Sequence, residues 1–329
     1  MGATDKVADY GIDYLSIRSF EMIFLFIFSV FSSARQATGD TRTPVILSAV
    51  AIILNIILTP IFIFQLNMEV MGAALATLIA NLITLPLVLF FLFNRRFYIH
   101  VQWKDMGFNR EIYRKIFQVG LPATVGSGLS SFGFVILQAM ILGFGVTTAA
   151  AFSVGNRISA FFLMPGMSLG SVLSSYIGQN MGAGNVERAK EAYRVSRNAS
   201  IIIMSSLALF ALPFIHPLAS LLSSGETLLL AKDYLVFLFL TQPFMAIYNS
   251  YCGVFDGSGN TRLSFLMHTV RLWVFRIPVI LLLREFTQLG SSAIWICMLL
   301  SNFLISIVGY FLMKRVDFDK TLIKMEETR

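Results

Sequence analysis

The chain has 329 residues, of which 56% are hydrophobic and 13% are charged, and its mean hydropathy is +0.75. A soluble domain carries about 25% charged residues, so this composition excludes an ordinary soluble enzyme or binding module. The net charge of +7 is spread over the connections between apolar segments, and it therefore does not call for a nucleic-acid partner.

Nine segments are long and apolar enough to cross a membrane as helices. About 20 residues at 1.5 Å each span a hydrocarbon core of about 30 Å. The alternating ten-residue segments of a membrane β-barrel do not occur. In chain order, the predicted helices cover residues 15–34, 44–66, 71–93, 118–143, 148–178, 200–222, 234–255, 263–283 and 290–313. The sequence thus predicts an all-α polytopic membrane protein.

Lysine and arginine are distributed unequally between the two sets of alternating connections. One set carries 18 of them, including six in residues 95–115, and the other carries Lys6, Lys232 and Arg284. Because basic residues concentrate on the cytoplasmic side, the C-terminus is predicted to be cytoplasmic and Met1 to lie on the outer side. The expected location is the plasma or inner membrane.

Two connections repeat each other. "QATGDTRTP" (36–44) and "DGSGNTRLS" (256–264) share Gly, Thr and Arg at the same three places, 220 residues apart. The same offset aligns Asp-Tyr-Leu at 13–15 with Asp-Tyr-Leu at 233–235. Helices one to three therefore repeat as helices seven to nine, while helices four to six have no counterpart. In a protein built from two equal repeats, that counterpart would occupy about 100 residues upstream, so nine of an expected twelve helices are present.

The stretch "YIGQNMGAGNVERAKEA" (176–192) is rich in glycine, as phosphate-binding loops are. A dinucleotide-binding loop follows a β-strand, whereas this stretch follows a membrane helix. Gly178, Gly182 and Gly184 are therefore expected to end that helix, before a charged segment at the membrane surface. The chain shows no hydrolase triad, nucleotide-binding loop or metal-ligand spacing. No catalytic residue, metal site or cofactor is predicted, and a nucleotide is not an expected partner.

Four stretches in this order and spacing resemble the multidrug and toxic compound extrusion (MATE) family. They are "GDTRTP" (39–44), "GLP" (120–122), "GQNMGAGNVERAK" (178–190) and "WVFRIP" (273–278). The resemblance implies two six-helix bundles that export organic cations and drugs by alternating access, driven by inward flow of Na+ or H+. The expected partners are an amphiphilic small-molecule substrate and membrane lipid.

The resemblance also implies a division of the chain into four parts. Residues 1–93 would form the C-terminal half of the first bundle. Residues 94–115 would form a basic cytoplasmic linker, residues 116–315 the second six-helix bundle, and residues 316–329 a cytoplasmic tail.

Many family members bind the coupling cation in the first bundle, through an Asp on helix 1, an Asn and an Asp on helix 5, and a Thr on helix 6. Asn55 matches the Asn and Thr77 matches the Thr, but Thr59 stands where the second Asp is usual. These neutral oxygens can help to coordinate Na+ but cannot take up a proton, so the coupling carboxylate is missing or lies upstream. Hydrogen bonding between helices would explain Asn55 and Thr77 equally well.

One branch of the family places acidic residues on the first and fourth helices of the second bundle. The matching positions here hold Ser130 and Met245, and no carboxylate occurs in residues 118–178 or 234–255. The chain therefore resembles the DinF-like branch, which puts a sodium site in the second bundle in doubt.

Five polar residues inside the predicted helices are candidates for lining a substrate cavity. A charge at the bilayer centre costs about 2.5–3.5 kcal/mol on insertion scales, so such residues need a partner or a function. Arg18 and Glu21, three residues apart on one helix, are expected to pair, and a structural role is the favoured alternative for them. The candidates are Arg18, Glu21, Gln138, Asn156 and Arg276.

Three interpretations remain. The first is a secondary antiporter that exports amphiphilic or cationic drugs or metabolites in exchange for Na+ or H+. The second is a lipid-linked oligosaccharide flippase of the same superfamily, which would be expected to carry more cationic residues in its cavity. The third is a truncated fragment with no transport activity.

Overall fold

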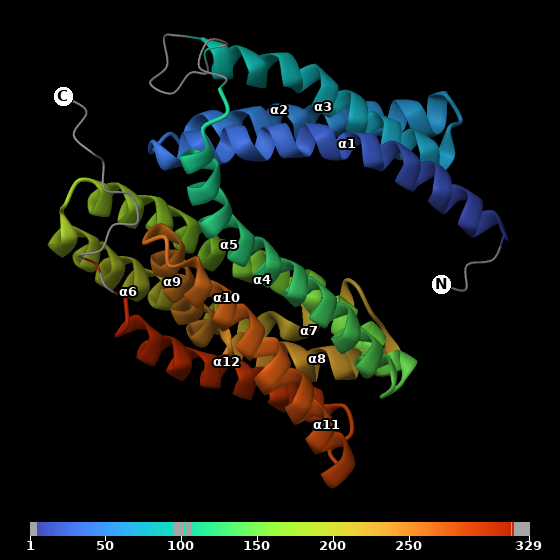
Figure 1. The fold of residues 1–329 in the computed structure, drawn as a ribbon. Helices are drawn as coiled ribbons and strands as arrows, with labels where there is room; N and C mark the ends of the chain where they lie inside the picture. The colour runs from blue at the N-terminus through green and yellow to red at the C-terminus, as the bar shows by residue number, and fades with distance from the viewer. Residues whose placement is uncertain (1–4, 95–101, 103–106, 317, 319–329) are drawn as a thin grey trace. The chain divides into compact units, whose positions relative to one another are not determined.

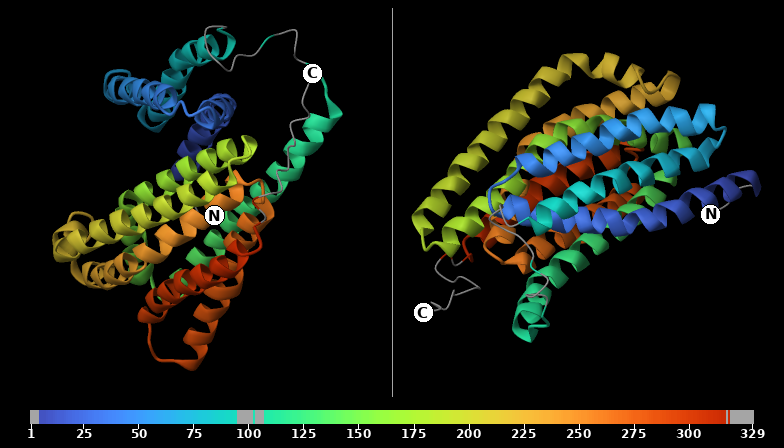
Figure 2. Two further views of the ribbon diagram at one scale, coloured as in Figure 1. Left: turned by 90° about the vertical axis from the view of Figure 1, so that its left-hand side faces the viewer. Right: turned by 90° about the horizontal axis from the view of Figure 1, so that it is seen from above.

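The computed structural model describes residues 5–94, 102, 107–316 and 318. Every regular element in this part of the chain is a helix, as the sequence predicts (Figure 1). The contacts divide the chain into two compact units, Met1–Phe108 and Asn109–Arg329, which are described separately below. The helices of both units are seen from two further sides in Figure 2.

Unit 1 contains three long helices, and the last of them packs against both of the others. The elements are α1 (Asp5–Ala37), α2 (Arg42–Pro60), the π-helical η1 (Ile61–Gln65) that continues α2, and α3 (Glu69–Phe93). Contacts of α3 with α1 and with α2 outnumber those between α1 and α2. Polar residues on α3 can therefore meet partners on either side.

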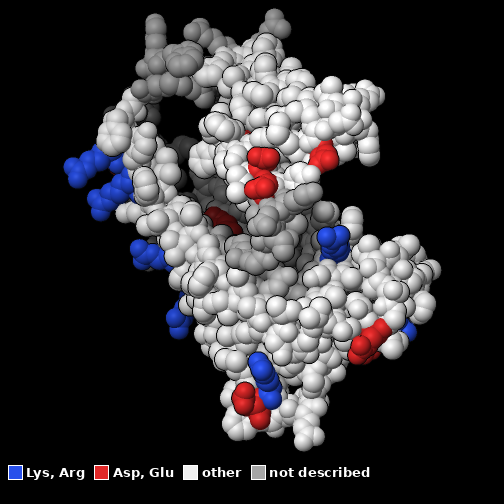
Figure 3. Space-filling view, turned by 90° about the vertical axis from the view of Figure 1, so that its right-hand side faces the viewer, with Lys and Arg blue, Asp and Glu red and all other residues white. Residues whose placement is uncertain are grey.

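The core of unit 1 is small. Phe31, Leu47 and Val88, one from each helix, form its buried cluster. Many other large apolar side chains, such as Phe26 and Ile46, are exposed. A monomeric soluble protein rarely exposes so much apolar surface, whereas lipid-facing helices must. On the face drawn in Figure 3, residues other than Lys, Arg, Asp and Glu likewise cover most of the surface described.

Unit 2 is a larger helical bundle in which α5 contacts α6, α8 and α9, while α4 contacts α10 and α12 contacts α9 and η4. Its elements are α4 (Arg110–Leu142), α5 (Val146–Gly182), α6 (Val186–Ala211), η3 (Leu212–Phe214), α7 (Ile215–Ser220), α8 (Gly225–Leu240), α9 (Gln242–Gly257), α10 (Thr261–Thr269), the π-helical η4 (Val270–Arg276), α11 (Ile277–Phe286) and α12 (Ser292–Met313).

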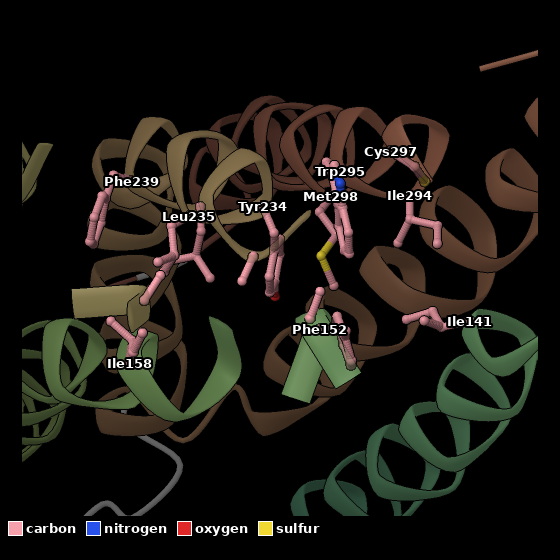
Figure 4. Close-up of a cluster of buried hydrophobic side chains, with 14 of the residues drawn as sticks. Ile141, Phe152, Ile158, Tyr234, Leu235, Phe239, Ile294, Trp295, Cys297 and Met298 are labelled. Atoms are coloured by element: carbon pink, nitrogen blue, oxygen red, sulfur yellow. The ribbon is translucent and has the colours of Figure 1, made fainter. Parts of the chain in front are cut away.

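Aromatic rings stack in the main core of unit 2 (Figure 4). The ring centroid of Tyr234 on α8 lies 4.4 Å from that of Trp295 on α12 and 5.4 Å from that of Phe152 on α5, and the centroids of Trp295 and Phe152 are 6.4 Å apart. Gly155, one turn after Phe152, leaves room for this ring, because a Cβ there would contact Tyr234 directly. The absence of a side chain at Gly155 thus allows α8 to pack closely against α5.

Eight helices of the described chain are long and apolar enough to cross a membrane, and a bent pair makes a ninth if it is one span. The pair is α8 and α9, which meet at Thr241 with a bend of 50°. Pro243, near the start of α9, has no N–H to donate and its ring clashes with the preceding turn, which accounts for the break. Each of the nine predicted segments corresponds to one of these spans. Four of them run one or two residues past the end of a helix, and they are 44–66, 118–143, 200–222 and 290–313.

The repeated connections adopt the same backbone turn. Gly39 and Gly259 have φ of 85° and 74°, in the left-handed region that glycine tolerates best, and each ends a helix. Gly184 ends α5 in the same way, with φ of 73°. The expectation for Gly178 is wrong, because α5 continues to Gly182 and Gly178 lies inside it.

Several predictions concern residues that the structure does not describe. Half of the predicted linker 94–115 falls in 95–101 and 103–106, and α4 already begins at Arg110. The predicted tail 316–329 lies outside the described residues except for 316 and 318, and so does Met1. The division into linker, bundles and tail stays a prediction.

Candidate functional site

The polar residues of unit 1 gather along one face of α3. Thr77, Asn81 and Thr84 are four and three residues apart, a spacing that places side chains on the same side of a helix. Thr77 contacts α2, and Asn81 contacts α1. A line of polar groups therefore runs through helices whose other side chains are mostly apolar.

Towards α2, the structure brings the three predicted cation-binding residues together. Asn55 Nδ2 donates to Thr77 Oγ1 at 2.9 Å, and Thr59 Oγ1 lies at 3.5 Å from Asn55 Oδ1. Thr77 Oγ1 in turn donates to the carbonyl of Ala73 at 3.0 Å. The cluster offers neutral oxygens that suit a weakly bound cation and no group that could carry a proton. Its role in cation binding stays a prediction.

Towards α1, a carboxylate is buried among apolar residues. Only 2% of Glu21 is exposed, and it forms the expected ion pair with Arg18. Asn81 Nδ2 donates to Glu21 Oε1 at 3.0 Å. Asn81 is not among the predicted site residues. Its amide lies in a predicted membrane helix one turn after Thr77, a position that indicates hydrogen bonding to another helix.

A hollow of about 230 Å³ opens beside Asn81, between the three helices of unit 1. This volume is below the 300–1,000 Å³ typical of pockets for drug-sized ligands. Its walls are mostly apolar, with polar groups from Ser48, Asn81 and Thr84. The lining residues are Phe24, Leu25, Phe28, Leu47, Ser48, Ala51, Ile52, Asn81, Thr84, Leu85 and Val88.

In unit 2, Arg276 is buried at the end of η4, with 8% of the residue exposed. Its Nε donates to Ser301 Oγ at 3.1 Å and its Nη2 donates to Asn302 Oδ1 at 3.0 Å, both on α12. Both acceptors are neutral, so the positive charge is hydrogen-bonded but not paired among the described residues. The burial of Arg276 separates its charge from lipid, and its role in lining a substrate cavity stays a prediction.

A second arginine, Arg271, lies one π-helical turn earlier. Its guanidinium stands 4.4 Å from the ring centroid of Tyr248, and its Nη1 lies 3.4 Å from Met245 Sδ, both on α9. The Nε of Arg271 is buried without a described partner. The Tyr248 hydroxyl also lies 2.6 Å from Nδ1 of His268. Arg271 is not among the five candidates predicted from the sequence to line a cavity.

The two other candidates in unit 2 differ in their surroundings. Asn156 Oδ1 accepts a hydrogen bond of 2.8 Å from the hydroxyl of Tyr234, which ties it to the aromatic core. Gln138 is exposed on α4 and makes no hydrogen bond among the described residues. The structure therefore links Asn156, but not Gln138, to buried polar groups.

The described residues include no group of three or more His, Cys, Asp and Glu side chains that could hold a metal. Cys252 and Cys297 are both free and buried. The polar groups described above are neutral oxygens and a paired carboxylate in unit 1, and two arginines among neutral partners in unit 2.

A family model, MatE, matches residues 1–61 and 122–282, more than half of the chain. The chain belongs to the MatE family. Relatives of this MatE chain include the probable multidrug resistance protein YoeA of Bacillus subtilis, with 24% identity over 90% of this chain and 66% of the relative. A protein of Shewanella oneidensis named FAD transporter is 26% identical over 96% of this chain and 71% of its own length.

The MatE chain spans about two thirds of the length of these relatives, and 60% of the probable multidrug resistance protein NorM of Thermotoga maritima. Solved structures confirm the fold. An outward-facing MATE transporter of the MOP superfamily superposes with a TM-score of 0.90, at 24% identity over 96% of this chain and 71% of that one. A MOP-superfamily transporter from Pyrococcus furiosus gives 0.91, also at 24% identity, over 98% and 73%. The family comprises transporters, not enzymes, and the chain is a multi-pass membrane protein.

Proposed function

We propose that this MatE-family chain serves secondary active efflux, exporting amphiphilic or cationic drugs or metabolites in exchange for Na+ or H+. In this mechanism one bundle moves relative to the other, and cation binding favours one of the two orientations. Three of the relatives that support the proposal are named as multidrug resistance proteins. The observation that carries it is the polar network along α3, because buried polar groups in membrane-spanning helices mark ion and substrate pathways.

In this proposal, the cation binds to Asn55, Thr59 and Thr77. The hydrogen bond from Asn55 uses one of the two lone pairs of the Thr77 hydroxyl oxygen, and a sodium ion at this oxygen would repel the positive N–H that donates it, so cation binding and this bond compete. Competition of this kind gives the cation a different affinity for two arrangements of the helices, which coupling requires. Asn81, one turn after Thr77 on α3, donates to the buried carboxylate of Glu21 on α1.

The proposed location is the plasma or inner membrane, with the C-terminus in the cytoplasm. The excess of basic residues in one set of connections, 18 against three, supports this orientation.

The experiment is counterflow in proteoliposomes that contain the 329-residue chain. Uptake of ethidium is measured against an imposed Na+ gradient, an imposed H+ gradient, and no gradient. We expect uptake to require one of the gradients and to fall in the Asn55→Ala and Thr77→Val variants. Ser19→Ala is the matched control, because Ser19 is exposed on α1 and its hydroxyl bonds only to its own helix. Uptake that is equal with and without both gradients would refute ion coupling.

A further inference from the structure

Two arginines of unit 2, Arg271 and Arg276, lie five positions apart in the π-helical segment η4. Arg276 is 8% exposed, and the Nε of Arg271 is buried without a hydrogen-bond partner. Neither arginine forms an ion pair among the residues that the structure describes. Both belong to one short segment, Val270–Arg276. Unit 2 therefore holds two positive charges without a described ion pair on one short segment, one on a buried side chain and one on a half-buried side chain.

No buried carboxylate balances this charge within the described part of unit 2, where each acidic residue is exposed. These residues are Glu111, Glu187, Glu191, Glu226, Asp233, Asp256 and Glu285. Burying a charge beside neutral partners alone is unfavourable, and a like charge next to it increases the penalty. A bound anion that is not part of the chain would remove this penalty.

The π-helical backbone of η4 brings Arg271 and Arg276 closer to one face of the helix than an α-helix would. In an α-helix, residues five apart point about 140° away from each other. The wider turn of a π-helix, with its hydrogen bonds from residue i to i+5, brings such residues towards one face. Pro278 accounts for the wider turn, because it cannot donate to the carbonyl of Val274. Arg271 reaches partners on α9 and Arg276 reaches partners on α12.

Both guanidinium groups keep N–H donors that the described hydrogen bonds do not use. A guanidinium has five N–H donors, and Arg276 uses two of them on Ser301 and Asn302. Arg271 has its Nε free and stacks on Tyr248, which holds the guanidinium plane. Planar guanidinium groups match the geometry of phosphate oxygens, with two hydrogen bonds from each fork. A phosphate monoester carries a charge of about −1.5 to −2 at pH 7, which balances two arginines.

We propose that Arg271 and Arg276 bind a phosphate group of the transported molecule, so that the substrate class of this chain includes organic phosphates. Tyr248 and His268, which adjoin Arg271, supply further polar contacts. The inference rests on the proposed transport function for its biological meaning. It differs from that proposal in the charge of the cargo, since a positively charged drug would be repelled from this site.

Binding to the purified chain in neutral detergent tests the inference without any gradient. Three pairs of molecules that differ in one phosphate are compared by equilibrium dialysis: FMN with riboflavin, AMP with adenosine, and dioleoylphosphatidic acid with dioleoylglycerol. We expect the phosphorylated member of at least one pair to bind about tenfold or more tightly. Preference within a soluble pair assigns the phosphate to a small metabolite, and preference within the lipid pair alone assigns it to a lipid headgroup. Preference in none of the pairs would overturn the inference.

The variants Arg271→Gln and Arg276→Gln are expected to abolish the preference. Arg284→Gln is the matched control, because Arg284 is exposed on α11 and stacks on Phe144 without sharing the pair's surroundings. A preference that survives in both Gln variants contradicts the assignment of the site.

A measurement on the unmodified chain covers the case in which a Gln variant fails to fold. Phenylglyoxal modifies accessible arginines, and mass spectrometry reports the rate at each position. The preferred phosphate should slow modification of Arg271 and leave that of Arg284 unchanged. Equal rates at Arg271 with and without the phosphate would overturn the inference. Because these assays involve no gradient, their failure leaves the transport proposal standing, and a failure of gradient-driven uptake leaves the phosphate site standing.

Discussion

The side-chain amide of Asn55 on α2 donates to the hydroxyl of Thr77 on α3 at 2.9 Å, which joins two helices through residues 22 positions apart. Thr59 lies one turn from Asn55 on the same face of α2, with its hydroxyl 3.5 Å from the amide oxygen. The hydroxyl oxygen of Thr77, one of the oxygens proposed to coordinate a cation, therefore also accepts the hydrogen bond that joins α2 to α3.

The first prediction concerns the strength of this hydrogen bond. In a double-mutant cycle of Asn55→Ala and Thr77→Val, we expect a coupling energy of about 0.6 kcal/mol, and at most about 1.7 kcal/mol, as found for side-chain hydrogen bonds within membranes. Unfolding by SDS in mixed micelles measures it. If the two substitutions add without coupling, the hydrogen bond does not contribute to stability.

A second prediction concerns the buried carboxylate of Glu21. Glu21→Gln removes the negative partner of Arg18 and is expected to destabilise the chain by about 1–3 kcal/mol, below the range for a fully buried pair because the Arg18 side chain is 34% exposed. The double variant with Arg18→Gln should recover most of the loss, because no unpaired charge remains. Unfolding by SDS is compared between the unmodified chain, Glu21→Gln and the double variant. A double variant less stable than Glu21→Gln alone would contradict the pairing argument.

The third prediction is a pH dependence at the turn between α1 and α2, outside the membrane-spanning segments. Burial alone would raise the pKa of Asp40, but hydrogen bonds from Thr43 and the charge of Arg35 outweigh burial and lower the pKa below its usual 3.8. Arg35 lies 3.7 Å from Asp40 and also donates to the carbonyl of Phe91 on α3 at 2.8 Å.

Because the pKa of Asp40 is lower in the folded than in the unfolded state, its ionised form stabilises the fold above about pH 4. This contribution is expected to disappear as the pH falls below 3.8 through the lowered pKa of the folded state. Unfolding measured between pH 3 and pH 6 should show a weaker dependence on pH in Asp40→Asn than in the unmodified chain. Identical pH profiles would refute the contribution.

A fourth prediction concerns the close approach of α5 and α9. A Cβ on Gly253 would lie 2.5 Å from the carbonyl oxygen of Gly170, so Gly253→Ala forces the two backbones apart. We expect a loss of about 1–3 kcal/mol, typical of overpacking. Gly128→Ala is the control, since a Cβ at Gly128 on α4 meets nothing within 4 Å and should leave stability unchanged or slightly higher. Equal effects of the two substitutions in SDS unfolding would show that the contact is dispensable.

The sequence by itself determined the helices and the turns between them. Long apolar segments can satisfy their backbone hydrogen bonds in a membrane only as helices, and a glycine in a left-handed conformation at positions 39 and 259 ends a helix through local geometry. The pairing of Arg18 with Glu21 was predictable for the same reason, because residues three apart on a helix are neighbours. The sequence placed the helix end wrongly at Gly178, where the glycine serves packing against Gly257 instead.

Only the tertiary structure decided which polar groups meet across helices. Asn81 joins Glu21 over 60 positions, and Arg276 joins Asn302 over 26, and no local period encodes either contact. The absence of a buried carboxylate beside Arg271 and Arg276 in the described residues of unit 2 also depends on which side chains the packing exposes. Spacing along the chain specifies a helix face, whereas the partner of that face depends on how the helices assemble.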